Sequence, residues 1–176
     1  MLINPENKGI ENAVVSFENI SQGKKHDPLE ISLVTFHCRF VHRILAAMIG
    51  DSYEVKNADP ILHNTYLQFG TSSILSVILE PNGSPIKKPL VNDAGIIYGK
   101  CNAHKFMTAN ILVFSQPYFA ITNKNGGFKI SDIPPGSYKV KIWHEILPIQ
   151  ETKIKIESGH ETKLSLELSF NKYKKF

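Results

Sequence analysis

Cysteine is scarce in this chain: Cys38 and Cys101 are the two among 176 residues. So few cysteines exclude a small domain stabilised by a framework of disulfides. No apolar run approaches the roughly 18 residues that span a bilayer, so we expect no transmembrane segment. The net charge of +4 is small and diffuse, and we therefore expect no nucleic-acid partner. The chain also lacks the glycine pattern of a dinucleotide-binding loop, and no catalytic Ser/His/Asp or Cys/His signature stands out, so we expect no enzyme.

Short alternating or β-branched runs dominate the sequence, and turn residues such as PNG, NKNGG and PPG separate them. Many short strands at spacings of about 8–12 residues are typical of a β-sandwich or barrel. We therefore predict an all-β protein. The expected strands are 13–20, 29–36, 42–49, 52–57, 72–79, 95–101, 108–114, 119–122, 126–130, 137–145, 152–157 and 162–168.

The segment SQPY at 115–118 separates two groups of expected strands and predicts a domain boundary. We expect a first domain over 1–116 and a second, smaller one over 117–176, which ends in a solvated basic tail, NKYKKF. Within the second domain, NKNGG at 123–127 predicts a hairpin, because Gly126 and Gly127 can adopt the positive φ that such turns need.

The segment CNAHKFM at 101–107 places three metal-ligand side chains close together. Cys101 offers a thiolate, His104 an imidazole and Met107 a thioether, and soft sulfur with imidazole suits copper better than magnesium or calcium. A further imidazole would complete the His₂Cys set with a weak axial Met that defines a blue-copper site. His63, in DPILHN at 59–64, is the candidate, and the amide of the following Asn64 can form hydrogen bonds around the ligand loop.

Residues 52–116 resemble the cupredoxins, and three segments carry the resemblance. These are VKNADPILHN at 55–64, YGKCNAHKFM at 98–107 and QPYFAIT at 116–122. Their order resembles the methylamine-utilisation or plastocyanin-like type, with a short ligand loop of the amicyanin kind. The resemblance implies a Greek-key β-sandwich with copper ligands His63, Cys101, His104 and Met107. Ala103 and Lys105 depart from the prolines common beside the second His.

The segment NGGFKISDIPPGSYKVKIWHE at 125–145 resembles carboxypeptidase regulatory-like domains, which are small transthyretin-like β-sandwiches. That resemblance implies a structural or interaction unit, and a partner could bind through this C-terminal β domain.

Cys38 lies in FHCRFVH at 36–42 and has several interpretations. It could form a secondary metal or thiol site with His42, because the two share one face of an alternating strand, although they lie far apart along it. A Cys38–Cys101 disulfide would instead consume the ligand sulfur. The resemblance implies that a signal peptide and a leading strand are missing from this chain, which would leave Cys38 unpaired. His26 and His160 lie in polar segments and are expected to be exposed.

The leading hypothesis is a periplasmic or secreted blue-copper protein that cycles one copper between Cu(I) and Cu(II) and passes electrons to a redox protein. The alternatives are a protein that sequesters or delivers copper, and a non-catalytic β-sandwich interaction module with a vestigial metal site.

Overall fold

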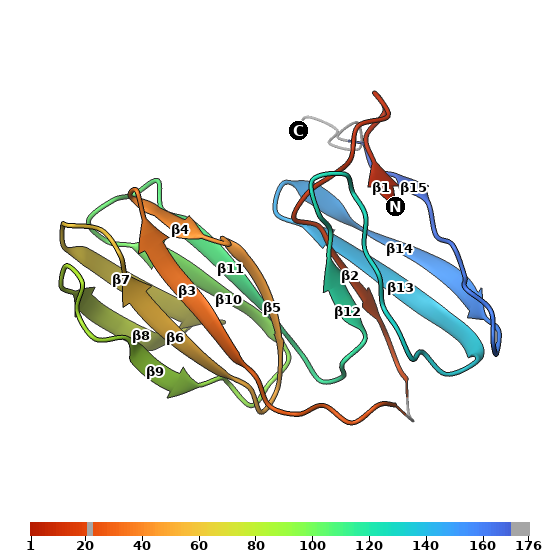
Figure 1. Cartoon of the computed structure of the whole chain (residues 1–176), viewed down its shortest axis with the longest axis horizontal. Coiled ribbons are helices and arrows are strands. Elements are labelled where there is room, and N and C mark those ends of the chain that lie inside the picture. The colour runs from red at the N-terminus through yellow and green to blue at the C-terminus, as the bar shows by residue number, and fades with distance from the viewer. Residues whose placement is uncertain (21–22, 170–176) are drawn as a thin grey trace. The chain divides into compact units, whose positions relative to one another are not determined.

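The protein is described by a computed structural model that covers residues 1–20 and 23–169, so the predicted basic tail lies outside the described residues. Fifteen strands and no helix make up this part of the chain, which confirms the prediction of an all-β protein (Figure 1). Accordingly, the described residues contain no helix long and apolar enough to cross a membrane. The chain divides into two compact units, and each is described by itself.

The unit His26–Ser115 is a sandwich of two β-sheets. Strands β3 and β6 pair in parallel, as do β5 and β11, and the remaining pairs are antiparallel. One sheet has the order β4-β3-β6-β9, with bounds Arg39–Val41, Glu30–Phe36, Ser52–Asn57 and Ile86–Pro89. The other has the order β5-β11-β10-β7-β8, with bounds Ile44–Met48, Thr108–Phe114, Gly95–Cys101, His63–Phe69 and Ser72–Leu79.

The core of this unit lies between the two sheets, because their strands alternate inward apolar and outward polar side chains. In β6, Tyr53, Val55 and Asn57 are buried, whereas the alternating residues Ser52, Glu54 and Lys56 are not. In β7 the buried positions are His63, Thr65 and Leu67, so the alternation turns His63 inward. This strand start is therefore part of the hydrophobic interior.

The second unit combines Met1–Lys25 with residues 116–176. Its main sheet has the order β12-β2-β13-β14, with bounds Phe119–Ile121, Val14–Phe17, Gly136–His144 and Leu147–Ile156. A two-stranded parallel sheet joins β1, Leu2–Ile3, to β15, Leu166–Glu167. The predicted domains of 1–116 and 117–176 thus need correction, since the first 25 residues belong to the C-terminal unit. The predicted break at 115–118 does coincide with the end of the other unit.

Strand β2 explains why the N-terminal segment joins this unit. All four of its side chains are buried, as befits a short apolar strand in the middle of a sheet. It pairs with β12 on one side and β13 on the other. A central strand cannot be removed without leaving the backbone groups of both neighbours unpaired. The unit is therefore incomplete without the first residues of the chain.

The NKNGG segment forms the predicted turn, but residues 126–130 do not continue as a strand. The Asn123 side chain accepts hydrogen bonds from the N–H groups of Asn125 and Gly127, which closes the turn. Gly126 has a φ of 71°, and its carbonyl accepts a bond from Leu2 N–H at 2.8 Å. A Cβ at Gly126 would lie 1.8 Å from the Leu2 carbonyl oxygen. The turn therefore binds Leu2 of β1 through a backbone hydrogen bond and does not start a hairpin.

Candidate metal centre

The pairing of β7 with β10 brings His63 and Cys101 to the same end of the sandwich. The two strands are antiparallel, and Thr65 is the Cα partner of Cys101. The start of β7 therefore meets the end of β10. Two segments 38 residues apart thus contribute one ligand-type side chain each to a single site.

The segment 101–107 is the tight loop between β10 and β11. Cys101 N–H donates to the Met107 carbonyl at 3.1 Å, and Met107 N–H donates to the His104 carbonyl at 2.9 Å. These bonds fold the loop so that Cys101 and Met107 are each 1% exposed while His104 is half-buried. Met107 belongs to the hydrophobic core cluster that includes Cys101. The loop therefore presents a buried sulfur and a partly accessible imidazole together.

The donor atoms of Cys101, His63 and His104 face one another. The Cys101 sulfur lies 3.8 Å from His63 Nδ1 and 3.6 Å from His104 Nδ1. The two imidazole centroids are 4.8 Å apart. Metal bonds of about 2.3 Å to sulfur and about 2.0 Å to nitrogen, at roughly 120°, separate sulfur from nitrogen by about 3.7 Å. The three side chains therefore fit one ion in a trigonal arrangement.

Asp59 orients the His63 ring through the nitrogen that faces away from Cys101. His63 Nε2 donates to Asp59 Oδ2 at 2.9 Å, and both residues are buried. The carboxylate also accepts the N–H groups of His37, at 2.6 Å, and of Cys38, at 2.9 Å. A carboxylate held against Nε2–H leaves Nδ1 as the ligand atom of the neutral ring, which is a common way to orient a metal-binding histidine.

The pKa of Asp59 reflects the same contacts. Burial by itself would raise the pKa, because it penalises the charged form. The hydrogen bonds from Cys38, His37 and His63 outweigh burial, so the pKa lies below its ordinary value. Asp59 is therefore ionised near neutral pH and acts as an acceptor only.

Asn57 holds the loop that carries Asp59. Its Oδ1 accepts from Thr35 Oγ1 at 2.8 Å and from Asp59 N–H at 2.9 Å. Its Nδ2 donates to the carbonyls of Ile61 and Leu79, at 2.7 and 3.0 Å. All four hydrogen-bonding positions of this buried amide are used. Asn57, the last residue of β6, thus holds in place the segment that leads to His63.

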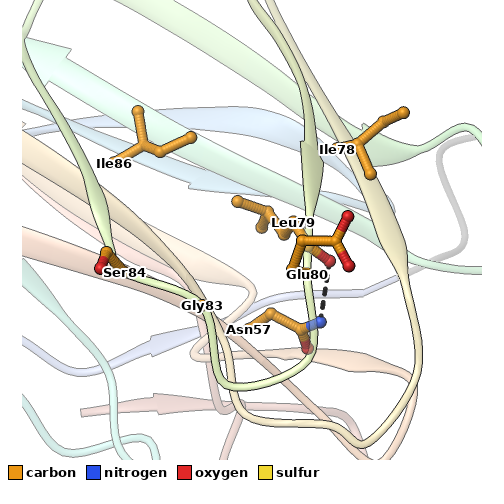
Figure 2. A pocket seen from close by; sticks show the side chains of 7 residues that line it. All are labelled: Asn57, Ile78, Leu79, Glu80, Gly83, Ser84 and Ile86. Atoms are coloured by element: carbon orange, nitrogen blue, oxygen red, sulfur yellow. Dashed lines mark hydrogen bonds between the residues drawn. The ribbon is translucent and has the colours of Figure 1, made fainter.

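Asn57 also lines a small pocket, shown in Figure 2 with its bond to the Leu79 carbonyl. None of the candidate metal ligands lines it. The lining residues are Asn57, Ile78, Leu79, Glu80, Gly83, Ser84 and Ile86.

Asn64 ties the start of β7 to the ligand loop. Its carbonyl accepts Asn102 N–H at 2.9 Å, and its side-chain Oδ1 accepts Asn102 Nδ2 at 3.2 Å. The Asn64 amide thus contacts the ligand loop through the side chain of Asn102. Ala103 and Lys105 are exposed, in agreement with a loop whose outer edge faces solvent.

The site of Cys38 with His42, one of the possibilities that the sequence leaves open, stays a prediction. His42 is exposed, and no three-residue group of metal-ligand side chains in residues 1–20 and 23–169 contains it. Cys38 instead groups with Asp59 and His63, with one ligand atom from each lying within 4.8 Å of the others. Both cysteines are free thiols, so no disulfide consumes the Cys101 sulfur. His160 is exposed as expected, whereas His26 is half-buried and bonded to Asp51.

Asp59 lies in the DPILHN segment, and its role is not evident from the sequence. A carboxylate four residues before a candidate histidine ligand was the available signal. The hydrogen bonds from His37 and Cys38 to the Asp59 carboxylate cannot be predicted from local sequence, because they join residues more than 20 positions apart.

Comparison with known proteins gives partial likenesses to copper proteins. The chain is similar to a reduced mutant of amicyanin, at 16% identity over 57% of this chain and 98% of that one, with a TM-score of 0.44. It is also similar to a Cu(I) form of another amicyanin mutant, at 16% identity over 59% of this chain and 100% of that one, with a TM-score of 0.44. The copper-containing nitrite reductase of Thermus scotoductus SA-01 is 16% identical over 57% of this chain and 27% of that one, with a TM-score of 0.45.

The family model for polysaccharide lyase family 4, domain II, matches residues 96–164. This stretch runs from β10 through β14 and so crosses from one unit into the other. It overlaps the region that resembles carboxypeptidase regulatory-like domains, and the matching family is a different one. No curated protein matches the chain in sequence.

Proposed function

We propose that the unit His26–Ser115 binds one copper ion through His63, Cys101 and His104, with Met107 as a weak axial ligand, and carries single electrons. The observation that supports this proposal is the convergence of one sulfur and two Nδ1 atoms at 3.6 and 3.8 Å. Thiolate, two imidazoles and a thioether form the donor set of blue-copper sites. Bound copper would supply a one-electron Cu(II)/Cu(I) couple.

The residues around the ligands suit electron transfer because they hold the donors still. His63 is fixed by Asp59, and the ligand loop is fixed by its own backbone bonds and by Asn64. A rigid donor set changes little when the charge of the ion changes. Four donors from the chain would leave no open position for a substrate, and on this ground we propose that the protein is not an enzyme.

His104 provides the route for electrons to a redox protein. It is the half-buried ligand, and its ring lies 6.0 Å from that of Phe106, which is 71% exposed. By its resemblance to exported cupredoxins, we assign the protein to the periplasm or the extracellular space, with the second unit as a carboxypeptidase regulatory-like interaction module.

The test is a titration of the purified full chain with Cu(II), followed by visible absorption and metal analysis. We expect an intense thiolate-to-copper band at one copper per chain. Absence of the band in folded protein with a free Cys101 thiol would overturn the proposal.

A second candidate function is the handling of copper as Cu(I). The grouping of a second thiol, Cys38, with Asp59 and His63 favours it. Tight Cu(I) binding without a stable Cu(II) form would support this function over electron transfer.

A further inference from the structure

Cys38 occupies an unusual backbone position at the tip of the β3–β4 hairpin. His37 and Cys38 form the two-residue turn between Phe36 and Arg39, with φ values of 51° and 53°. Such turns favour Asn and Gly, because most side chains are strained at positive φ. Strained positions persist where their surroundings hold them. Here both N–H groups of the turn donate to Asp59.

The turn places a thiol beside the same aspartate that orients His63. One ligand atom from each of Cys38, Asp59 and His63 lies within 4.8 Å of the other two. Asp59 and His63 are buried, whereas Cys38 is half-buried and is a free thiol. Thiolate, carboxylate and imidazole are the three ligand types that zinc takes in proteins. The group is therefore chemically complete for a zinc-type cation, with a fourth position left for water.

The Cys101 sulfur and the Asp59 carboxylate lie at opposite nitrogens of the His63 ring. Nδ1 lies 3.8 Å from the Cys101 sulfur, whereas Nε2 lies 2.9 Å from Asp59. We propose that Cys38, Asp59 and His63 form a second site, for a borderline-soft divalent cation such as zinc, which shares the His63 ring with the first site.

The proton balance of this site makes the two sites compete. Binding at Nε2 displaces the hydrogen that His63 donates to Asp59, and binding at sulfur displaces the Cys38 thiol hydrogen. A neutral imidazole keeps one hydrogen, which then resides on Nδ1 and removes that lone pair from the first site. The thiol hydrogen goes to solvent. One chain therefore holds one ion at a time, on either side of His63.

The experiment uses the C101S variant of the 176-residue chain, in which Cys38 is the remaining cysteine. The probe is Co²⁺, whose thiolate bond gives a charge-transfer absorption that Zn²⁺ should abolish by displacement. We expect one Co²⁺ per chain with this absorption. The matched control is C38S C101S, which differs by one atom at the half-buried turn and should lack the absorption. Equal spectra for the two variants would overturn the proposal.

Two further measurements test the shared ring. His63→Gln in the C101S background leaves Asp59 and the turn in place, and it should weaken Co²⁺ binding at least about tenfold. Unchanged affinity would overturn the assignment of His63. In the wild type, two Co²⁺ ions per chain with thiolate absorption from both cysteines would overturn the proposal that the two sites compete for His63. Because Cys101 is absent from the main test, its result does not depend on whether the first site binds copper.

Discussion

Asp51 and Asp59 are two buried aspartates of the unit His26–Ser115 with nearly identical hydrogen bonding. Asp51 accepts the N–H groups of Leu29 and Met48, at 2.8 and 2.7 Å, and lies 2.6 Å from His26 Nε2. Asp59 likewise accepts two backbone N–H groups and one histidine Nε2. Each is 3% exposed.

The two aspartate–histidine pairs differ at the histidine nitrogen that faces away from the aspartate, Nδ1. The Cys101 sulfur faces Nδ1 of His63, whereas within residues 1–20 and 23–169 no metal-ligand group contains His26. The unit thus uses a carboxylate–imidazole pair twice to hold backbone N–H groups. Only the pair at His63 also faces a sulfur, which makes it part of the candidate metal centre.

The largest expected effect separates the two cysteines. C101S should lose the wild-type thiolate-to-copper band completely, because serine oxygen does not replace thiolate as a soft ligand. C38S should keep the band and the stoichiometry of one copper. Visible absorption with copper analysis checks both. A band that survives in C101S and disappears in C38S would assign the copper sulfur to Cys38 instead.

The next effect separates the two histidines. His63→Gln should weaken copper binding by about 100-fold or more, because it removes a ligand and not only a supporting contact. His26→Gln should leave the affinity within about twofold, since among residues 1–20 and 23–169 His26 belongs to no group of metal-ligand side chains. Competition against a chelator of known affinity measures both constants. Comparable losses in the two variants would mean that His63 acts through fold stability.

The two aspartates should differ in metal affinity and agree in stability. Asp51→Asn and Asp59→Asn should each lower the free energy of unfolding of the metal-free protein by about 2 kcal/mol, because each weakens hydrogen bonds to a buried charge. Asp59→Asn should also weaken copper binding about tenfold through the His63 ring. Urea unfolding and metal titration separate the effects, and equal copper affinities would remove the distinction between the two aspartates.

The smallest effect is a pH dependence that the two aspartates share. Burial would raise the pKa of Asp51, but hydrogen bonds from Leu29, Met48 and His26 outweigh it and lower the pKa, as at Asp59. A lowered folded-state pKa contributes stability above the ordinary value of 3.8, and this contribution is lost as the pH falls through the folded-state pKa. The urea concentration at the unfolding midpoint of the metal-free protein should therefore decrease as the pH is lowered below about 4.

The same urea series provides its own control. The pH dependence should be shallower in Asp51→Asn and in Asp59→Asn than in the wild type, and shallowest in the double variant. Parallel curves for the wild type and the double variant would show that other groups control acid stability.

Several strands follow from the local pattern alone. The predicted ranges 52–57, 72–79, 95–101 and 108–114 are those of β6, β8, β10 and β11, because their residues alternate and turn residues bound them. The Pro turn before His63 predicts a short strand that begins or ends at this residue, and His63 is indeed the first residue of β7. Residues 126–130 alternate like a strand but form none, and Gly126 instead accepts a hydrogen bond from Leu2 of β1, which the local pattern does not reveal.

The strand-rich fold class and the short loop that carries Cys101, His104 and Met107 can be predicted from the sequence, since both depend on residues close in the chain. The place of β2 in the C-terminal unit and the hydrogen bonds of Asp59 to Cys38 and His63 emerge at the level of tertiary structure. Strand partners and buried hydrogen-bond acceptors are chosen among segments far apart in sequence. Those choices satisfy backbone groups of the whole molecule together.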